Sequence, residues 1–115
     1  MFDDNCIFCK IAKGEIPANK AYEDENMVII HDLNPQAPVH LLLIPKDHYA
    51  NICEMTDAQA ATLAKCVKKL SSLVDELGLK DGFRLVSNKG ENGCQSVQHL
   101  HIHILGGKHL SDNMG

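Results

Sequence analysis

The sequence predicts an α+β domain that consists of a five-stranded antiparallel sheet with one long and one short helix. Five short segments are apolar or alternate between apolar and polar residues, which is typical of strands. One longer segment repeats its apolar residues at helical spacing. The chain has 115 residues, which fits one domain with one modest core, so we assign residues 1–115 to a single domain.

The first half of the chain contains one short helix and three of the five strands. The helix lies in CIFCKIAKG and ends at Gly14, with Pro17 beyond it. Two short strands, KAYE and MVIIHD, flank the acidic turn DEN. NPQAP interrupts regular structure because Pro35 and Pro38 lack the amide proton that a sheet needs. VHLLLIP is apolar at most positions, which predicts a strand buried on both faces.

The second half begins with the long helix and ends with the last two strands. Thr56 and Gln59 have the spacing of a capping box, and apolar residues follow at three- and four-residue steps. Gly78 occupies a position where helices commonly end, so we expect a helix over roughly residues 57–77. GFRLVSN and HLHIHIL predict the two remaining strands.

Composition excludes several classes of function. The formal net charge of −4 argues against a nucleic-acid binder, which needs a basic face. No apolar run approaches the roughly 20 residues that span a bilayer, and MFDDNCIFCK has no signal-sequence pattern, so we expect a cytoplasmic protein. Its five cysteines should then be reduced, and we expect Cys53, Cys66 and Cys94 to serve packing.

Three histidines alternate with apolar residues in QHLHIHILGG. On a strand, His99, His101 and His103 would share one face, and Leu100 and Ile102 would share the other. Such a row could be a solvated polar face, a metal site or a catalytic row. The preceding NKGENGCQSVQH offers exposed backbone amides and a hydroxyl, which suit a phosphate group. These flanking residues favour the catalytic interpretation.

Several long motifs resemble one known family. HLHIHIL resembles the histidine triad motif, and QSVQHLHIHILGG, HDLNPQAP, HLLLIPKDH and IFCKIAKGEIPA resemble the Hint branch of the histidine triad (HIT) family. The resemblance spans about residues 5–108. Gly106 and Gly107 follow the triad as in Hint proteins, whereas the branch that hydrolyses dinucleoside polyphosphates usually has Pro-Arg there. The resemblance implies a HIT-like fold and a homodimer whose two sheets form one continuous ten-stranded sheet.

The resemblance also implies an activity, the hydrolysis of purine nucleoside 5′-phosphoramidates to an amine and a nucleotide such as AMP or GMP. Two alternatives remain open at this point. The chain could hydrolyse dinucleoside polyphosphates or other nucleotidyl substrates, or it could be a nucleotide-binding regulatory protein with incidental turnover. Turnover of an adenosine phosphoramidate distinguishes the first activity from the regulatory alternative.

Carried over residue by residue, the resemblance assigns a role to each motif. His101 would be the nucleophile that becomes nucleotidylated, and its second nitrogen would need an acceptor, for which a backbone carbonyl of its own strand is suitable. His103 and Ser96 would bind phosphate oxygens or the leaving group, and His40 would orient or relay protons. Asp32 would bind the ribose. The rest of the nucleotide pocket would comprise Leu33 beside the nucleoside, and Asn88 with the backbone of Cys94, Gln95 and Ser96 around the phosphate.

One position departs from the family pattern. The family loop often reads Gly-Gly-Gln-Ser, whereas this chain has Cys94 in place of the second glycine. If the backbone there needs a positive φ angle, Cys94 is strained. The tail KHLSDNMG also lacks the Trp-Pro-Pro-Gly end of some relatives, which affects the expected leaving-group preference.

A second constellation concerns a metal. Cys6 and Cys9 form a Cys-x-x-Cys pair, which by itself fits a redox pair or packed cysteines as well as a metal site. The resemblance implies a structural zinc ion bound by Cys6, Cys9, His48 and His99, and no organic cofactor. Two thiolates and two imidazoles are a common ligand set for structural zinc.

Overall fold

The fold is an α+β domain built on a single antiparallel sheet, as the sequence predicts. The structure is a computed structural model that describes residue 3 and residues 5–114. All neighbouring strands are antiparallel, in the order β1-β2-β3-β5-β4. The elements, in chain order, are α1 (Ile7–Ala12), β1 (Lys20–Glu23), β2 (Met27–His31), β3 (Val39–Pro45), α2 (Asp57–Leu70), β4 (Phe83–Ser87) and β5 (Ile102–Gly106).

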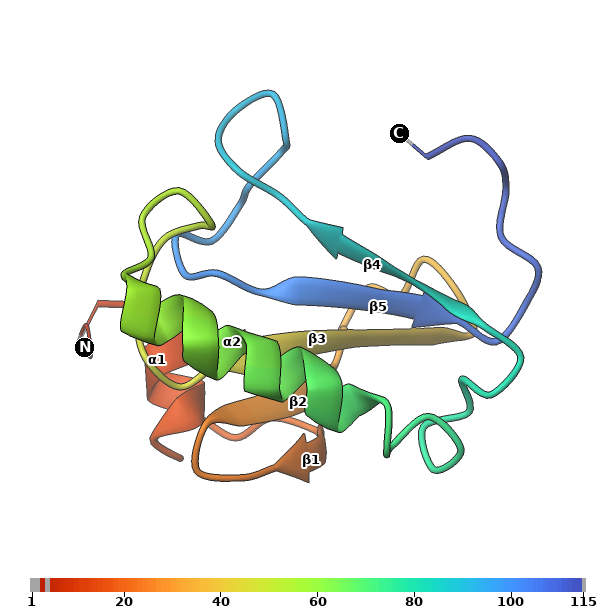
Figure 1. Cartoon of the computed structure of the whole chain (residues 1–115), viewed down its shortest axis with the longest axis horizontal. Coiled ribbons are helices and arrows are strands. Elements are labelled where there is room, and N and C mark those ends of the chain that lie inside the picture. The colour runs from red at the N-terminus through yellow and green to blue at the C-terminus, as the bar shows by residue number, and fades with distance from the viewer. Residues whose placement is uncertain (1–2, 4, 115) are drawn as a thin grey trace.

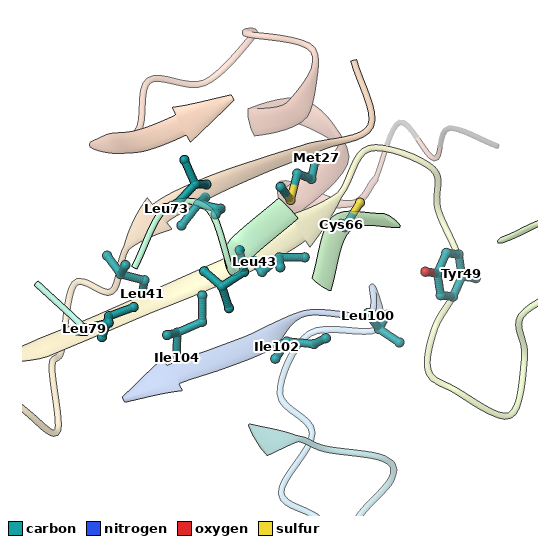
Figure 2. Packing of buried hydrophobic residues seen from close by; sticks show 12 residues of the cluster. Met27, Leu41, Leu43, Tyr49, Cys66, Leu73, Leu79, Leu100, Ile102 and Ile104 are labelled. Atoms are coloured by element: carbon teal, nitrogen blue, oxygen red, sulfur yellow. The ribbon is translucent and has the colours of Figure 1, made fainter. Parts of the chain in front are cut away.

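The sheet is covered by a different helix on each face. The long helix α2 crosses one face, and the short helix α1 lies behind the sheet near one end (Figure 1). Side chains alternate along the strands, so Leu41 and Leu43 pack toward α2 while Leu42 and Ile44 pack toward α1. Figure 2 shows the core beneath α2, where Leu41 and Leu43 lie close to Ile104. Because α1 has only six residues, it covers only part of its face.

The long helix begins as predicted but ends earlier. The Thr56 hydroxyl accepts the N–H of Gln59, and the Gln59 side chain accepts the N–H of Thr56, so the capping box is confirmed. The prediction that the helix reaches residue 77 is wrong, because α2 ends at Leu70. The hydroxyls of Ser71 and Ser72 donate to carbonyls three residues earlier, which stabilises tight turns in place of α-helix.

The last strand is shorter than HLHIHIL. β5 begins at Ile102, so the prediction that residues 99–101 belong to the strand is wrong. Continuing the register Leu43–Ile102 would place Leu100 opposite Pro45, which has no N–H to donate. Instead, the Leu100 N–H donates to the carbonyl of Tyr49 at 2.7 Å. The alternation persists nevertheless, since Leu100, Ile102 and Ile104 are all buried in the core beneath α2.

Two further observations concern the expectations from composition. Among the described residues, no helix is long and apolar enough to cross a bilayer. Of the three isolated cysteines, Cys66 is a buried residue of α2 that packs in the core, as expected. Cys53 and Cys94 are exposed, so the expectation that they pack in the core is wrong for both.

Candidate active site

The three histidines of the triad lie on the face of the sheet that carries α1. His99 has no exposed surface, His101 is 7% exposed and His103 is half-buried. The ring of Phe8, from α1, meets His101 edge-on with 5.0 Å between ring centroids, and it meets His99 at 6.0 Å. Phe8 therefore encloses the inner two imidazoles and leaves His103 at the open side of the row.

The backbone fixes the tautomer of His101. Its Nδ1 atom lies 2.8 Å from the carbonyl oxygen of His99. A carbonyl oxygen can only accept, so Nδ1 carries the hydrogen and donates it. The Nε2 atom of the neutral ring then has a free lone pair that can attack an electrophile. The expected acceptor, a backbone carbonyl of the same segment, is confirmed.

A chain of hydrogen bonds supports His103 from behind. The Nδ1 atom of His40 accepts the backbone N–H of Gln36 at 2.9 Å, so the ring hydrogen of neutral His40 is on Nε2. That Nε2 atom lies 2.9 Å from Nδ1 of His103 and 3.3 Å from Oδ2 of Asp32. His103 accepts through Nδ1, which leaves its Nε2–H free to donate toward a bound anion. The 5.2 Å between the rings of His101 and His103 allows one group to touch both.

Asp32, His40 and His103 bring three potential ligand atoms within 4.8 Å of one another. A cation there would have to replace the hydrogen on Nε2 of His40, because Nδ1 already accepts an N–H. The hydrogen bonds therefore account for this cluster without a metal. Burial lowers the pKa of His103 from its ordinary value, and the nearby His101 and His40 add to this effect.

The loop between β4 and β5 contains the residues that the sequence analysis expects around a phosphate. Asn88, half-buried, follows the last paired residue of β4, which places it next to His101 in the continued register. Cys94 has φ = 57°, so the backbone at this position does have the positive φ angle that strains a residue other than glycine. A Cβ atom at Gly93 would lie 2.7 Å from the carbonyl oxygen of Lys89, so only glycine fits there.

The loop uses several of its own amides internally. The N–H of Cys94 donates to the carbonyl of Glu91, and the N–H of Gln95 donates to that of Gly90, each at 3.0 Å. Ser96 is exposed, and within this described loop neither its hydroxyl nor its backbone N–H donates to a carbonyl of the loop. On the opposite side of the row, Leu33 is 99% exposed beside Asp32, which offers an apolar surface for a planar ring.

A second cluster combines both predicted cysteines with two histidines. Cys6, Cys9, His48 and His99 each direct one ligand atom to a common point, and these atoms lie within 4.8 Å of one another. Nδ1 of His99 lies 3.3 Å from Sγ of Cys6 and 3.1 Å from Nδ1 of His48. Nδ1 of His48 lies 3.2 Å from Sγ of Cys9. A tetrahedral zinc ion with ordinary bond lengths separates such atoms by roughly 3.3 to 3.8 Å.

Hydrogen bonds also prepare these atoms for a cation. The Sγ atom of Cys6 accepts the N–H of Cys9, and Sγ of Cys9 accepts the N–H of Asp3, each at 3.4 Å. Nε2 of His99 lies 2.7 Å from the carbonyl oxygen of Pro45, so Nε2 carries the ring hydrogen and the Nδ1 lone pair points into the cluster. Burial lowers the pKa of His99 to about 4 and raises that of Cys9 to about 11.

Some contributors to the site escaped the sequence analysis. Phe8 lies within the motif CIFC, which drew attention only for its cysteines. Gln36 and Pro45 act through their backbone groups, as donor to His40 and acceptor from His99, and no side-chain pattern signals such roles. The remaining histidines, His31 and His109, are exposed.

The fold and this site together define a class of α+β protein in which a row of three histidines lies on one face of an antiparallel sheet. Comparison with known proteins agrees. The family model described as the HIT domain matches residues 13–110. Protein HitA of Neisseria gonorrhoeae is 50% identical over 103 residues, which cover 90% of this chain and 96% of that protein. The chain belongs to the HIT family.

Two further relatives bear on the chemistry of the site. The 14 kDa zinc-binding protein of Zea mays is 40% identical over 111 residues, 95% of this chain and 87% of that protein. A crystal structure of a HIT family hydrolase from Legionella pneumophila Philadelphia 1 superimposes with a TM-score of 0.90 and 45% identity, covering 96% of this chain and all of that one. Proteins similar to this chain thus include a HIT family hydrolase and a zinc-binding protein.

Proposed function

We propose that this protein hydrolyses purine nucleoside 5′-phosphoramidates through a covalent nucleotidyl-His101 intermediate. The observation that carries the proposal is the fixed tautomer of His101, whose Nδ1 is bonded to the carbonyl of His99. Its Nε2 lone pair attacks the α-phosphorus and the P–N bond breaks, while the leaving nitrogen takes a proton from solvent through the Ser96 hydroxyl and departs as the amine. Water then attacks the same phosphorus and gives up a proton to solvent, which releases the nucleoside monophosphate and restores neutral His101.

His103 and Ser96 stabilise the charge that develops on the phosphoryl group. The Nε2–H of His103 can donate to a phosphoryl oxygen, because its Nδ1 atom accepts from His40 at 2.9 Å. The Ser96 hydroxyl donates to the leaving nitrogen or to a phosphate oxygen. His40 holds the ring of His103 in orientation, and Asp32 lies at the end of this chain of hydrogen bonds.

The nucleoside lies at the Asp32 end of the row. Oδ1 of Asp32 accepts the N–H of Asn34 at 2.7 Å, and each carboxylate oxygen has a further lone pair for a ribose hydroxyl. Leu33 packs against the base, which accounts for an apolar side chain that is 99% exposed without ligand. Asn88 and the loop around Cys94 and Gln95 surround the phosphate.

We further propose that Cys6, Cys9, His48 and His99 bind a structural zinc ion. The ligand types, their spacing and the tautomer of His99 all fit zinc, and the similarity to the zinc-binding protein of Zea mays supports the assignment. Zinc would supply no chemistry to the reaction. These four residues come from the start of α1, the segment after β3 and the segment before β5, so a shared ion would hold the three together.

We also propose a homodimer that joins two sheets into one of ten strands. β4 is an edge of the sheet and has unpaired backbone groups along one side. Phe83 and Leu85, on this strand, are each 40% exposed. Pairing β4 with its copy would satisfy the edge and cover both side chains.

The decisive experiment is rapid quenching of the wild-type protein during turnover of an adenosine 5′-phosphoramidate, followed by peptide mass mapping. We expect one adenylyl group on the peptide that contains His101, and no turnover by His101→Ala. An adduct on another residue would refute the mechanism. Faster turnover of a dinucleoside polyphosphate would favour the alternative hydrolase, and AMP binding without turnover would favour a regulatory protein.

A further inference from the structure

Gln95 makes three side-chain hydrogen bonds, all of them to the backbone. Its Oε1 atom accepts the N–H of Gly90 at 3.0 Å. Its Nε2 atom donates to the carbonyl of Ala50 at 2.6 Å and to that of Val97 at 3.1 Å. Both amide hydrogens are therefore used within the protein, and a bound phosphate would have to break one of these bonds to receive a hydrogen from Gln95.

The bonds of Gln95 first close the loop between β4 and β5 on itself. The backbone N–H of Gln95 donates to the carbonyl of Gly90, while the Gln95 side chain accepts the N–H of the same Gly90. This reciprocal pair joins the two ends of a six-residue segment. Gly93 and the positive φ angle of Cys94 allow the tight path between them.

The bond to Ala50 then attaches this loop to the segment that follows β3. Two carbonyls of this part of the chain, at the end of β3 and just beyond it, hold the start of the histidine row. Pro45 accepts from Nε2 of His99, and Tyr49 accepts the N–H of Leu100 at 2.7 Å. Residues 45–50 thus serve as a common backbone support. His99 and Leu100 are hydrogen-bonded to Pro45 and Tyr49, and the phosphate loop is hydrogen-bonded to Ala50 through Gln95.

We infer that Gln95 is a positioning residue, which sets Ser96 and the phosphate loop at the correct distance from His101 without touching substrate itself. The inference rests on the proposed function, because it assigns the loop to the transferred phosphoryl group. It adds a role for the Gln95 side chain to the expectation, taken from the resemblance, that the backbone of Cys94 to Ser96 surrounds the phosphate. A small displacement of the loop misaligns the reacting atoms, and misplacement by about 1 Å can cost about 100-fold in rate.

Two substitutions of Gln95 distinguish the role of its acceptor atom, Oε1, from the role of its donor atom, Nε2. Gln95→Met keeps the shape of the side chain and removes all three bonds. Gln95→Glu keeps an acceptor for the Gly90 N–H but places a carboxylate against the carbonyls of Ala50 and Val97. When the new carboxyl group is protonated, it can donate one hydrogen to a carbonyl again. Gln98→Glu is the matched control, because Gln98 is exposed in the same segment.

The test measures kcat and KM for an adenosine 5′-phosphoramidate, together with Kd for AMP, at several pH values. We expect Gln95→Met to lower kcat about 10- to 100-fold at every pH, while Kd for AMP changes less than about threefold. For Gln95→Glu, the ratio of its kcat to the wild-type kcat should rise as pH falls from about 8 to about 5, since protonation restores a donor. Amide exchange at Gly90 should accelerate in Gln95→Met and remain slow in Gln95→Glu.

Three results would overturn the inference. One is a kcat for Gln95→Met within about twofold of wild type, and another is a pH-independent kcat ratio for Gln95→Glu. The third is a loss of AMP affinity as large as the loss of kcat, which would make Gln95 a direct ligand. Failure of the proposed function would be distinguishable, because the wild-type protein itself would then not turn over the phosphoramidate.

Discussion

Cys94 offers a direct test of backbone strain in the phosphate loop. Among the described residues it is the only one other than glycine with a positive φ angle, 57°. This conformation costs a residue with a Cβ atom about 1 to 2 kcal/mol, whereas glycine adopts it freely. Against this, a glycine increases the entropy of the unfolded chain, which costs about 0.4 to 1 kcal/mol. The change Cys94→Gly should therefore raise the free energy of unfolding by about 0.5 to 1 kcal/mol.

Thermal unfolding followed by circular dichroism measures this effect. For a chain of this size the gain corresponds to a rise of roughly 2 to 5 °C in Tm. Cys53→Gly is the control, because Cys53 is also exposed but has no positive φ angle to relieve. It should lower Tm through the entropy of the unfolded chain alone. Cys94→Val should destabilise the protein further, since a branched side chain tolerates this conformation least.

The comparison between the two glycine variants decides the question. If Cys94→Gly lowers Tm as much as Cys53→Gly does, the backbone at position 94 is not strained and the reasoning is wrong. A gain in Tm combined with unchanged kcat would mean that the loop keeps its shape with glycine.

Four further predictions concern the histidine row, the metal cluster, the ribose and the dimer. Burial lowers the folded-state pKa of His103, so the unfolded chain takes up this proton first and stability falls as pH drops below 6.5. The free energy of unfolding, measured with urea, should therefore fall less between about pH 7.5 and about pH 5.5 for His103→Asn than for wild type. Equal falls would contradict the lowered pKa of His103. Protein purified without chelator or affinity tag should contain about one zinc ion per chain. Cys9→Ala should lose both zinc and thermal stability, whereas Cys66→Ala should keep its zinc, and a metal-free wild type of unchanged stability would remove the assignment. AMP should bind about 10- to 100-fold more tightly than its 2′-deoxy analogue, since a hydrogen bond to the Asp32 carboxylate is worth about 1.5 to 3 kcal/mol. Equal affinities would leave Asp32 as a turn residue only. Light scattering at micromolar concentration should give a dimer for wild type and a monomer for Leu85→Arg, and a wild-type monomer would exclude pairing through β4.

Local patterns in the sequence were sufficient for the elements whose stability is local. The apolar run in VHLLLIP and the capping box of Thr56 and Gln59 are local patterns within a few residues, and both were predicted correctly. The end of α2 and the start of β5 were predicted wrongly, because these boundaries depend on other parts of the chain or on competing side chains. Ser71 and Ser72 redirect the helix end, and Pro45 deprives residues 99–101 of a partner.

The sequence by itself determined which functional groups are available. The histidine row, the Cys-x-x-Cys pair and the glycine-rich loop can be recognised from residue types at fixed spacing. Only the tertiary structure decided how that chemistry is set up. The tautomers of His99 and His40 depend on the carbonyl of Pro45 and on the N–H of Gln36. The role of Gln95 likewise depends on the carbonyl of Ala50, 45 positions away. Backbone groups are identical at every such residue, so their partners are fixed by the path of the chain in space and leave no mark in the sequence.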